Sequence, residues 1–397
     1  MKGWINVKFG DIAESITDII SKPKESGLKD YIGLDELDTD QIRIKRFAST
    51  EDVNAQKFLC KKGDIIFGKR NAYLRKVAVS DRDAVASAHS MILRSKGKLI
   101  YNDFLPCLMQ SSNFWKIAQS ISEGSMSPTI KWRILAEQEF LIPPMEQQKK
   151  ISELLWAIEK SMQETEELIN LNEKLKIGLL NDLLTKGINH NKFKKTEIGE
   201  IPEEWNFVKI SEAILINPPR KIKEGDEVKF VAMENLIERE EKIKGFSNRI
   251  SKGGGSKFMN GDTLMARITP CLENGKTALV DILENKEIAL GSTEFIVLSP
   301  IKDMTISKYV YYLTIFPSIR NAAINSMIGT SGRQRVPNSF FNSIKIGIPP
   351  IDEQKRIVII LDSVSNLIKK LNLQKENTFL LKKKLTNKLI SGEIILK

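Results

Sequence analysis

The decapeptide IPPMEQQKKI at residues 142–151 returns at residues 348–357 as IPPIDEQKRI. Six of its ten positions are identical, and the other four exchange residues of similar size or charge. At the same offset of 206 positions, residues 175–188 align with residues 381–394 without a gap. A repeat on this scale fixes the architecture, because each copy folds as a similar unit. The sequence therefore predicts two similar halves.

The repeat continues upstream at slightly different offsets, which small loop insertions and deletions explain. KGDIIFGK at residues 62–69, for example, parallels NGDTLMAR at residues 260–267. Short apolar or alternating runs between Gly, Asp and Asn predict strands, and helical segments are predicted at 104–121 and 308–327. Each half is therefore expected to have mixed α and β structure with a largely antiparallel sheet. A chain of 397 residues also exceeds what one hydrophobic core usually supports.

A long helix is predicted after each globular part. The prolines of the decapeptide begin it, since proline is tolerated where first-turn amides have no partner, and the acidic residues that follow complement the helix dipole. Apolar residues then recur at spacings of three and four, as in a coiled-coil seam. These are Ile151, Leu155, Ile158, Met162 and Ile169 in the first helix, and Ile357, Leu361, Val364, Ile368 and Leu371 in the second. We expect the two stripes to pack together; the alternative is that each helix covers its own globular part.

The composition favours a polyanionic partner, because the net charge is +11 and the pI is near 9.3. Cys60, Cys107 and Cys271 are widely separated, as are His89 and His190, so neither a disulfide framework nor a metal site is predicted. No apolar run reaches the roughly 18 to 20 residues needed to span a bilayer, and the first residues lack the apolar core of a signal peptide. We therefore expect a cytoplasmic protein without a membrane partner.

With these residues in view, the chain resembles the specificity subunit of type I restriction-modification enzymes. The resemblance is carried by the Pro-Pro-x-x-x-Gln starts of both predicted helices and by IGEIPEEW at residues 198–205, which leads into the second half. It implies an α+β fold with two pseudo-symmetric α/β target-recognition domains separated by two long antiparallel coiled-coil helices. The expected divisions are a first target-recognition domain (1–141), a central helix (142–190), a linker with the second target-recognition domain (191–347) and a distal helix (348–397).

The resemblance also implies a subunit without catalysis of its own. It would read a bipartite, asymmetric sequence in double-stranded DNA and direct two methylase subunits, which modify adenine N6, and restriction subunits to it. No cofactor is expected in this chain, whereas S-adenosylmethionine and ATP with Mg are implied for the partner subunits. Two similar but unequal halves also suggest, on physical grounds, two unequal half-sites separated by unread bases, with the helices setting the gap.

Basic and polar residues in loops of both halves are candidates for DNA contact. Lys and Arg neutralise phosphates, whereas Arg on guanine and Gln on adenine can read major-groove edges bidentately. His89 and Glu294 occupy equivalent positions and form a further candidate pair. The candidates are Lys69, Arg70, Tyr73, Arg75, His89, Lys131 and Arg133 in the first half, and Arg267, Lys276, Glu294, Arg333, Gln334 and Arg335 in the second. The alternative is that these side chains are solvated or structural.

The sequence leaves two other hypotheses about function open. A self-sufficient DNA methyltransferase or nuclease would carry a catalytic fingerprint. INPPR at residues 216–220 has Arg220 where adenine methyltransferases carry a stacking aromatic residue, and ENGKT at residues 273–277 lacks the earlier glycine of a phosphate-binding loop. No catalytic residue is therefore predicted. A non-catalytic coiled-coil scaffold, whose basic charge is incidental, would not retain DNA at moderate salt.

Overall fold

The computed structural model describes residues 3–330 and 332–396. The chain forms two compact units: unit 1 is Met1–Leu168 with Leu371–Lys397, and unit 2 is Ile169–Lys370. Each unit thus contains one globular part together with a portion of both long helices. The predicted division into two similar halves is confirmed. Neither unit, however, is one continuous segment of the sequence.

Unit 1 contains two main sheets and a two-stranded ladder. The first sheet has the order β2 (Ala13–Ile16), β10 (Ser90–Ser95), β7 (Ile65–Gly68), β8 (Val77–Val79). The second has the order β3 (Ile19–Ile20), β6 (Lys57–Cys60), β9 (Ala84–Ala86), β4 (Asp30–Ile32), β5 (Ala48–Ser49). The ladder pairs β1 (Ile5–Lys8) with β11 (Glu139–Ile142). Apart from the parallel pair β4 and β9, the neighbouring strands run antiparallel, as predicted.

Unit 2 repeats this order of strands, except that its described residues include no counterpart of β3. Its first sheet is β15 (Ile214–Ile216), β22 (Phe295–Pro300), β19 (Thr263–Ala266), β20 (Thr277–Leu279), and its second is β17 (Ser247–Ile250), β16 (Glu227–Val231), β21 (Ala289–Gly291), β18 (Ser256–Phe258). The ladder pairs β14 (Asn206–Lys209) with β23 (Lys345–Ile348), and a hairpin of β12 (Phe193–Thr196) and β13 (Gly199–Pro202) precedes it. The parallel pair also recurs, between β16 and β21. The internal repeat is therefore a repeat of topology.

Short helices complete each unit at equivalent places. Unit 1 has α1 (Phe9–Ile12), α2 (Phe104–Gln110), α3 (Ser112–Ser120) and α4 (Trp132–Ala136); unit 2 has α6 (Ile210–Ala213), α7 (Ser307–Ile315), α8 (Pro317–Asn325) and α9 (Phe340–Ser343). The two predicted helical segments are each split in two. Ser111 breaks the first, because its hydroxyl accepts the Phe114 amide and begins α3, and Pro317 begins α8 in the second.

The two long helices are α5 (Met145–Thr185) and α10 (Ile351–Ile390), each beginning directly after a proline pair. The glutamine of the repeated motif explains that start. Gln148 donates to the carbonyls of Pro143 (2.9 Å) and Leu99 (3.0 Å), and its side-chain oxygen accepts the Tyr101 amide (2.7 Å). Gln354 makes the same three bonds, to Pro349, Met304 and Ile306. One buried side chain thus ties each helix start to the loop before α2 or α7.

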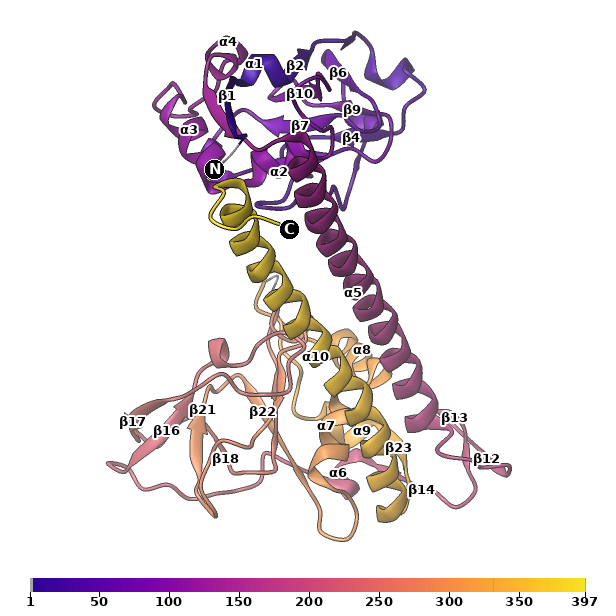
Figure 1. Cartoon of the computed structure of the whole chain (residues 1–397). Coiled ribbons are helices and arrows are strands. Elements are labelled where there is room, and N and C mark those ends of the chain that lie inside the picture. The colour runs from indigo at the N-terminus through magenta and orange to yellow at the C-terminus, as the bar shows by residue number, and fades with distance from the viewer. Residues whose placement is uncertain (1–2, 331, 397) are drawn as a thin grey trace. The chain divides into compact units, whose positions relative to one another are not determined.

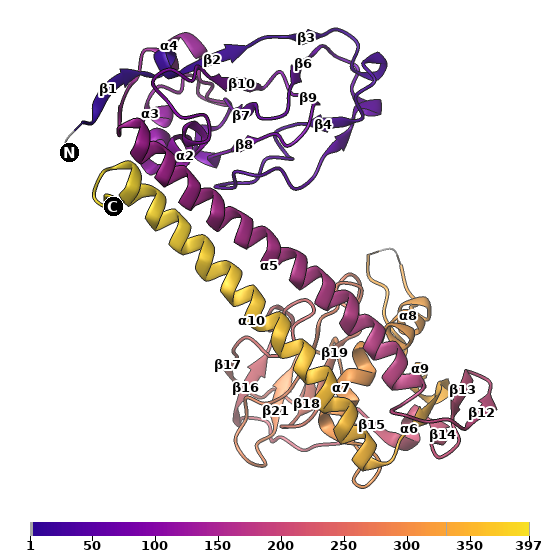
Figure 2. The same cartoon turned by 45° about the vertical axis from the view of Figure 1, so that its right-hand side comes forward.

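The helices pack against each other within each unit. In unit 1, Ile151 and Leu155 of α5 share a core with Leu389 and Ile390 of α10. In unit 2, Leu180 and Leu184 of α5 share a core with Ile357 and Leu361 of α10. The start of one helix therefore meets the end of the other, so the pairing is antiparallel. Both views show α5 and α10 side by side within unit 1 (Figure 1, Figure 2). The predicted seam is confirmed.

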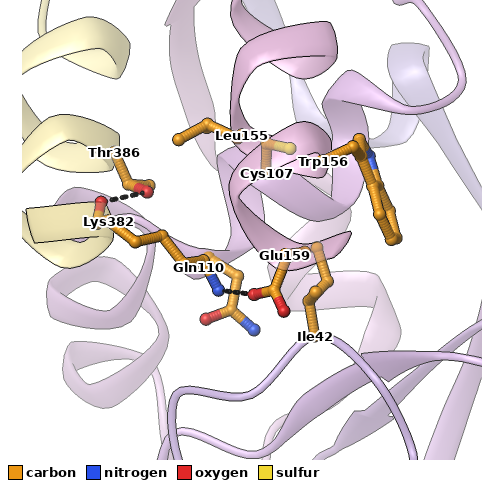
Figure 3. Close-up of a pocket in the computed structure, with 8 residues that line it drawn as sticks. All are labelled: Ile42, Cys107, Gln110, Leu155, Trp156, Glu159, Lys382 and Thr386. Carbon is orange, nitrogen blue, oxygen red and sulfur yellow. Dashed lines mark hydrogen bonds and ion pairs between the residues drawn. The ribbon is translucent and has the colours of Figure 1, made fainter. Parts of the chain in front are cut away.

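A buried ion pair joins the helices in unit 1. Lys382 of α10 contacts Glu159 of α5, and the two residues are only 5% and 4% exposed. Figure 3 shows both side chains meeting in a pocket that is also lined by Cys107 and Gln110 of the globular part. Charge at such a buried position is tolerated only when it is paired, so these two residues depend on each other.

Candidate nucleic-acid interface

Backbone contacts bring the predicted loops of unit 1 together. Arg70, just after β7, forms an isolated β-bridge with Thr129, and Thr129 bridges to Glu123 in turn. The Ile130 amide also donates to the carbonyl of Lys69 (2.9 Å). The segment 123–130 therefore lies against the β7–β8 loop, so two candidate loops that are far apart in sequence form one surface.

Positive side chains gather on this surface, and its carboxylate Glu123 is paired with Lys131. Partial desolvation lowers the pKa of His89, and the positive charges of Arg70, Lys69 and Lys57 lower it further. Burial, followed by the charge of Arg70, lowers the pKa of Lys69 as well. Within the described part of the chain, Lys69, Arg70 and His89 have no ion-pair partner. Such a cluster favours binding of an anion, of which a DNA phosphate is one.

The remaining candidates of unit 1 differ in solvent exposure and in whether they have an ion-pair partner. Tyr73 is 62% exposed, and Arg133 is exposed on α4 with no ion-pair partner among the described residues. Lys131 pairs with Glu123 (2.7 Å) at a solvated position, where such a pair contributes little. Arg75, by contrast, is mostly buried and lies 2.6 Å from Asp40. Arg75 therefore has a partner inside unit 1, and its role in DNA contact stays a prediction.

Unit 2 builds the same surface with different side chains. Arg335 forms isolated bridges with Ile268 and Ile328, in the pattern that Thr129 makes in unit 1. Arg335 also binds Glu294 bidentately, because its Nε donates to Oε2 (3.0 Å) and its Nη2 donates to Oε1 (2.7 Å). The hydrogen bond to Glu294, and then its charge, raise the pKa of Arg335. Two predicted residues thus form one partly exposed pair.

The other candidates of unit 2 surround this pair. The carbonyl of Gln334 accepts the Thr269 amide (3.0 Å), which fixes the loop and leaves the Gln334 side chain half-buried. Arg333 is exposed, and its carbonyl accepts a bond from Arg335 (3.1 Å). Residues 333–335 therefore present three polar side chains from one short stretch.

Two candidates of unit 2 hold backbone carbonyls instead of facing solvent. Arg267 donates to the carbonyl of Val336 (2.6 Å), and Lys276 donates to that of Met233 (3.1 Å). The equivalent of Lys276 in unit 1 is Lys76, whose Nζ donates to the carbonyl of Leu34 (2.6 Å). Both lysines stabilise the same loop in their own unit, which is a positioning role.

The motif INPPR also has a structural role. The Asn217 side chain accepts the Val297 amide (2.9 Å), and Arg220 forms a nearly buried ion pair with Asp262 (2.6 Å). No group of His, Cys, Asp and Glu that could hold a metal ion occurs among residues 3–330 and 332–396. Over the same residues, no helix combines the length and hydropathy needed to cross a membrane.

One feature of unit 2 is not evident from the sequence. Residues 252–257, KGGGSK, suggest only a flexible loop, yet part of this segment forms a wall of a surface groove together with Arg249 and Phe230. A sequence signal was present in the basic residues that flank the glycine run. The sequence does not reveal that β21, about 40 positions later, forms the floor of the groove.

Comparison with known proteins agrees with this geometry. The family model described as type I restriction modification DNA specificity domain matches residues 1–176 and again residues 202–378. The specificity subunit of the type I restriction enzyme EcoAI of Escherichia coli is 32% identical over 44% of this chain, and the match spans 30% of that protein's length. The putative MjaX specificity subunit of Methanocaldococcus jannaschii is 24% identical, covering 99% of this chain and 94% of the relative.

Solved structures show the same fold. A chain from structural work on complex assembly and conformational transition of the type I R-M system has a TM-score of 0.61 at 16% identity, with 99% of both chains covered. The S subunit of a type I restriction-modification system from M. genitalium has a TM-score of 0.57 at 12% identity, covering 98% of this chain and 96% of that one. The family model matches most of the chain, once in each half. The chain therefore belongs to the type I restriction-modification DNA specificity family, whose members select the DNA site and are not the catalytic components.

Proposed function

We propose that each unit of this chain reads one half of a bipartite, asymmetric sequence in double-stranded DNA. The chain then directs methylase partners, which modify adenine N6, and restriction partners to that sequence. The observation that carries the proposal is that equivalent loops of the two units present different chemistry. His89 and Thr129 in unit 1 stand where Glu294 and Arg335 stand in unit 2.

These differences support two unequal half-sites. Unit 1 offers unpaired positive charge from Lys69 and Arg70, which suits phosphates and the acceptor edge of guanine, beside the His89 imidazole, whose lowered pKa leaves it mostly uncharged at neutral pH. Unit 2 offers an arginine and a carboxylate side by side, and these can donate to guanine and accept from cytosine respectively. One base sequence does not satisfy both surfaces, so a symmetric target is not expected.

The long helices are proposed to set the gap between the half-sites. Half-sites on one face of B-DNA lie about 34 to 36 Å apart, centre to centre. A helix of 41 residues, such as α5, is about 60 Å long, which is enough to span that separation. Adding whole turns to α5 and α10 together should change the number of unread bases and leave both half-sites unchanged.

Two copies of one methylase partner fit the repeat. Leu175 of α5 is 50% exposed in unit 2, and Leu381 of α10, at the equivalent position, is 53% exposed in unit 1. A partner that binds one of these apolar positions finds its equivalent in the other unit, which supports two partners of one kind. The proposal assigns S-adenosylmethionine to the methylase partners and ATP with Mg to the restriction partners, and no cofactor to this chain.

The proposal is tested by expressing the chain with and without a cognate methylase subunit and mapping methylated adenines across a genome. A two-part asymmetric motif is expected only when both chains are present. Methylation by this chain alone would instead revive the stand-alone methyltransferase, and a continuous palindromic motif would contradict the two-headed mode of reading. If the complex neither methylates DNA nor retains it at moderate salt, the scaffold hypothesis gains support.

A sharper test exchanges residues 1–141 for those of a relative that reads a different sequence. Only one half of the motif should change, because the loops of unit 2 are untouched. A change in both halves would show that the units do not read independently.

A further inference from the structure

A surface groove of unit 2 has no assigned role. It lies on the sheet formed by β17, β16, β21 and β18, which are neighbours in Figure 1, and its volume is about 720 Å³. Val231 and Phe258 point to the core from one face of this sheet, whereas Phe230 and Leu290, which are paired in register, line the groove on the other. The groove is therefore an outward-facing surface of the sheet.

The groove carries a guanidinium that is held in place but not neutralised. The Arg249 guanidinium carbon lies 3.6 Å from the centroid of the Phe230 ring. Within the described part of the chain, the Arg249 side chain has no ion-pair or hydrogen-bond partner. Stacking on an aromatic ring restricts the guanidinium and leaves its N–H groups free to donate, so less entropy is lost when an anion binds. Lys252, exposed at the rim, adds a second positive charge.

Glycines form the opposite wall. Gly255 lies so close to β21 that an added Cβ would come within 2.8 Å of the Gly291 carbonyl oxygen, so only glycine fits there. Gly254 is different, because an added Cβ meets nothing within 4 Å and its backbone is outside the left-handed region. The wall thus contacts β21 closely at Gly255, whereas Gly254 has free space for a side chain.

The chemistry of the lining and its position indicate the occupant. The lining residues, all of them described, include two cations and no carboxylate. The groove ends at Thr293, the residue before Glu294 of the proposed reading pair. We propose that the groove holds the sugar-phosphate backbone of duplex DNA beside the half-site that unit 2 reads, with Arg249 and Lys252 contacting phosphates. This inference rests on the proposed function.

In unit 1, the described strands of the matching sheet (β3, β6, β9, β4 and β5) contain no arginine. Arg82 stacks over Phe47 at 4.4 Å, but it is also paired with Asp30 (3.2 Å) and Asp81 (2.9 Å). Its charge is therefore balanced before any DNA arrives. We expect the two units to divide backbone contacts unequally, with unit 2 contributing the phosphate contacts of this groove.

The test uses the full chain in complex with its methylase partner and measures affinity for a DNA duplex that contains the mapped motif, over a range of salt concentrations. Arg249→Gln and Lys252→Gln should each reduce the slope of log affinity against log salt by about 0.9, because each removes one phosphate contact. Both should weaken specific and non-specific duplexes alike and leave the methylation motif unchanged. Lys302→Gln, which removes an exposed lysine after the far end of β22, is the control and should change nothing.

A charge pair at Gly254 gives the decisive comparison, since either side chain fits without strain. Gly254→Glu should bind at least about tenfold more weakly than Gly254→Lys, because the two variants differ only in the charge placed in the groove. Equal affinity of these two variants, with unchanged salt slopes for Arg249→Gln and Lys252→Gln, would overturn the proposal. A changed motif would also overturn it, because the groove would then contact bases. Specific methylation by the unaltered complex shows separately whether the proposed function holds.

Discussion

Removing either partner of the buried Glu159–Lys382 pair should open unit 1 at the helix seam. Both side chains are almost fully buried, and Ile42, Cys107 and Leu155 line the same pocket (Figure 3). With Glu159→Leu, the ammonium of Lys382 would stay buried without a counter-charge. With Lys382→Met, the carboxylate would be stranded in the same way.

The expected magnitude follows from the burial. Breaking a buried ion pair from one side costs about 3 to 5 kcal/mol, whereas replacing both partners with apolar residues of similar size is often neutral or stabilising. The double variant Glu159→Leu with Lys382→Met should therefore lie within about 1 kcal/mol of the unaltered chain or above it. The coupling energy between the two substitutions should exceed about 3 kcal/mol.

Cys107 provides the measurement, because its thiol lines the pocket and is 2% exposed. Burial raises the pKa of Cys107 to about 12, so the thiol should react only when the seam opens. A loss of 3 kcal/mol in the free energy of opening corresponds to labelling about a hundredfold faster in each single variant, followed by peptide mass spectrometry. The double variant should label at nearly the original rate.

The control is Lys375→Met, which breaks a partly exposed pair with Glu166 (2.8 Å) on the same two helices and leaves Glu166 paired with Lys45 (2.8 Å). Such a pair contributes less than about 1 kcal/mol, so Cys107 labelling should change by only a few-fold. The reasoning is refuted if both single variants of the buried pair behave like this control. It is also refuted if the double variant is as unstable as the sum of the two single variants.

Three further predictions concern single residues. Burial lowers the pKa of Lys176 below its ordinary value of 10.5, so protonation of Lys176 opposes folding of unit 2. The free energy of unfolding should therefore rise as the pH increases from the folded-state pKa towards 10.5. Lys176→Met should abolish this rise, as measured by thermal unfolding at a series of pH values. Glu353 accepts a hydrogen bond from the indole N–H of Trp205 (2.9 Å) and makes two further hydrogen bonds. Glu353→Ala should therefore lower the free energy of unfolding by more than about 3 kcal/mol. Glu353→Gln, which keeps an acceptor oxygen, should lower it by less. Iodoacetamide at neutral pH should modify Cys271 before Cys60, since burial raises the pKa of Cys60 to about 12.

The long helices could be predicted from sequence because their signals are local. A proline pair, acidic residues in the first turn and an apolar stripe all lie within the helix itself. The role of the motif glutamine could not be predicted, because Gln148 bonds to Leu99 and Tyr101, almost 50 positions earlier. The break in the first predicted helical segment depended on a single hydroxyl, that of Ser111, which the apolar pattern around it conceals.

The sequence indicates which loops carry the candidate residues, but it does not indicate which of these side chains are bonded within the fold. Arg75 and Lys276 are candidates for DNA contact from the sequence, and each has a partner within the fold, Asp40 and the Met233 carbonyl, more than 30 positions away in sequence. Arg249 was missed for the converse reason. Its stacking on Phe230 depends on the pairing of β16 with β17, which puts the two side chains on the same face of the sheet.

The duplication explains how one scaffold presents two chemically different surfaces. Contacts that fix the backbone are the same in both units: Gln148 and Gln354 tie the helix starts, and Lys76 and Lys276 hold the same loop carbonyl. The side chains that project from the fixed loops, such as His89 in unit 1, differ between units. Because the projecting side chains contribute little to the retained contacts, they can be exchanged without loss of the loop geometry. Substitution of the projecting side chains can therefore change the surface that each unit presents, whereas a change in the retained contacts disturbs the loops themselves.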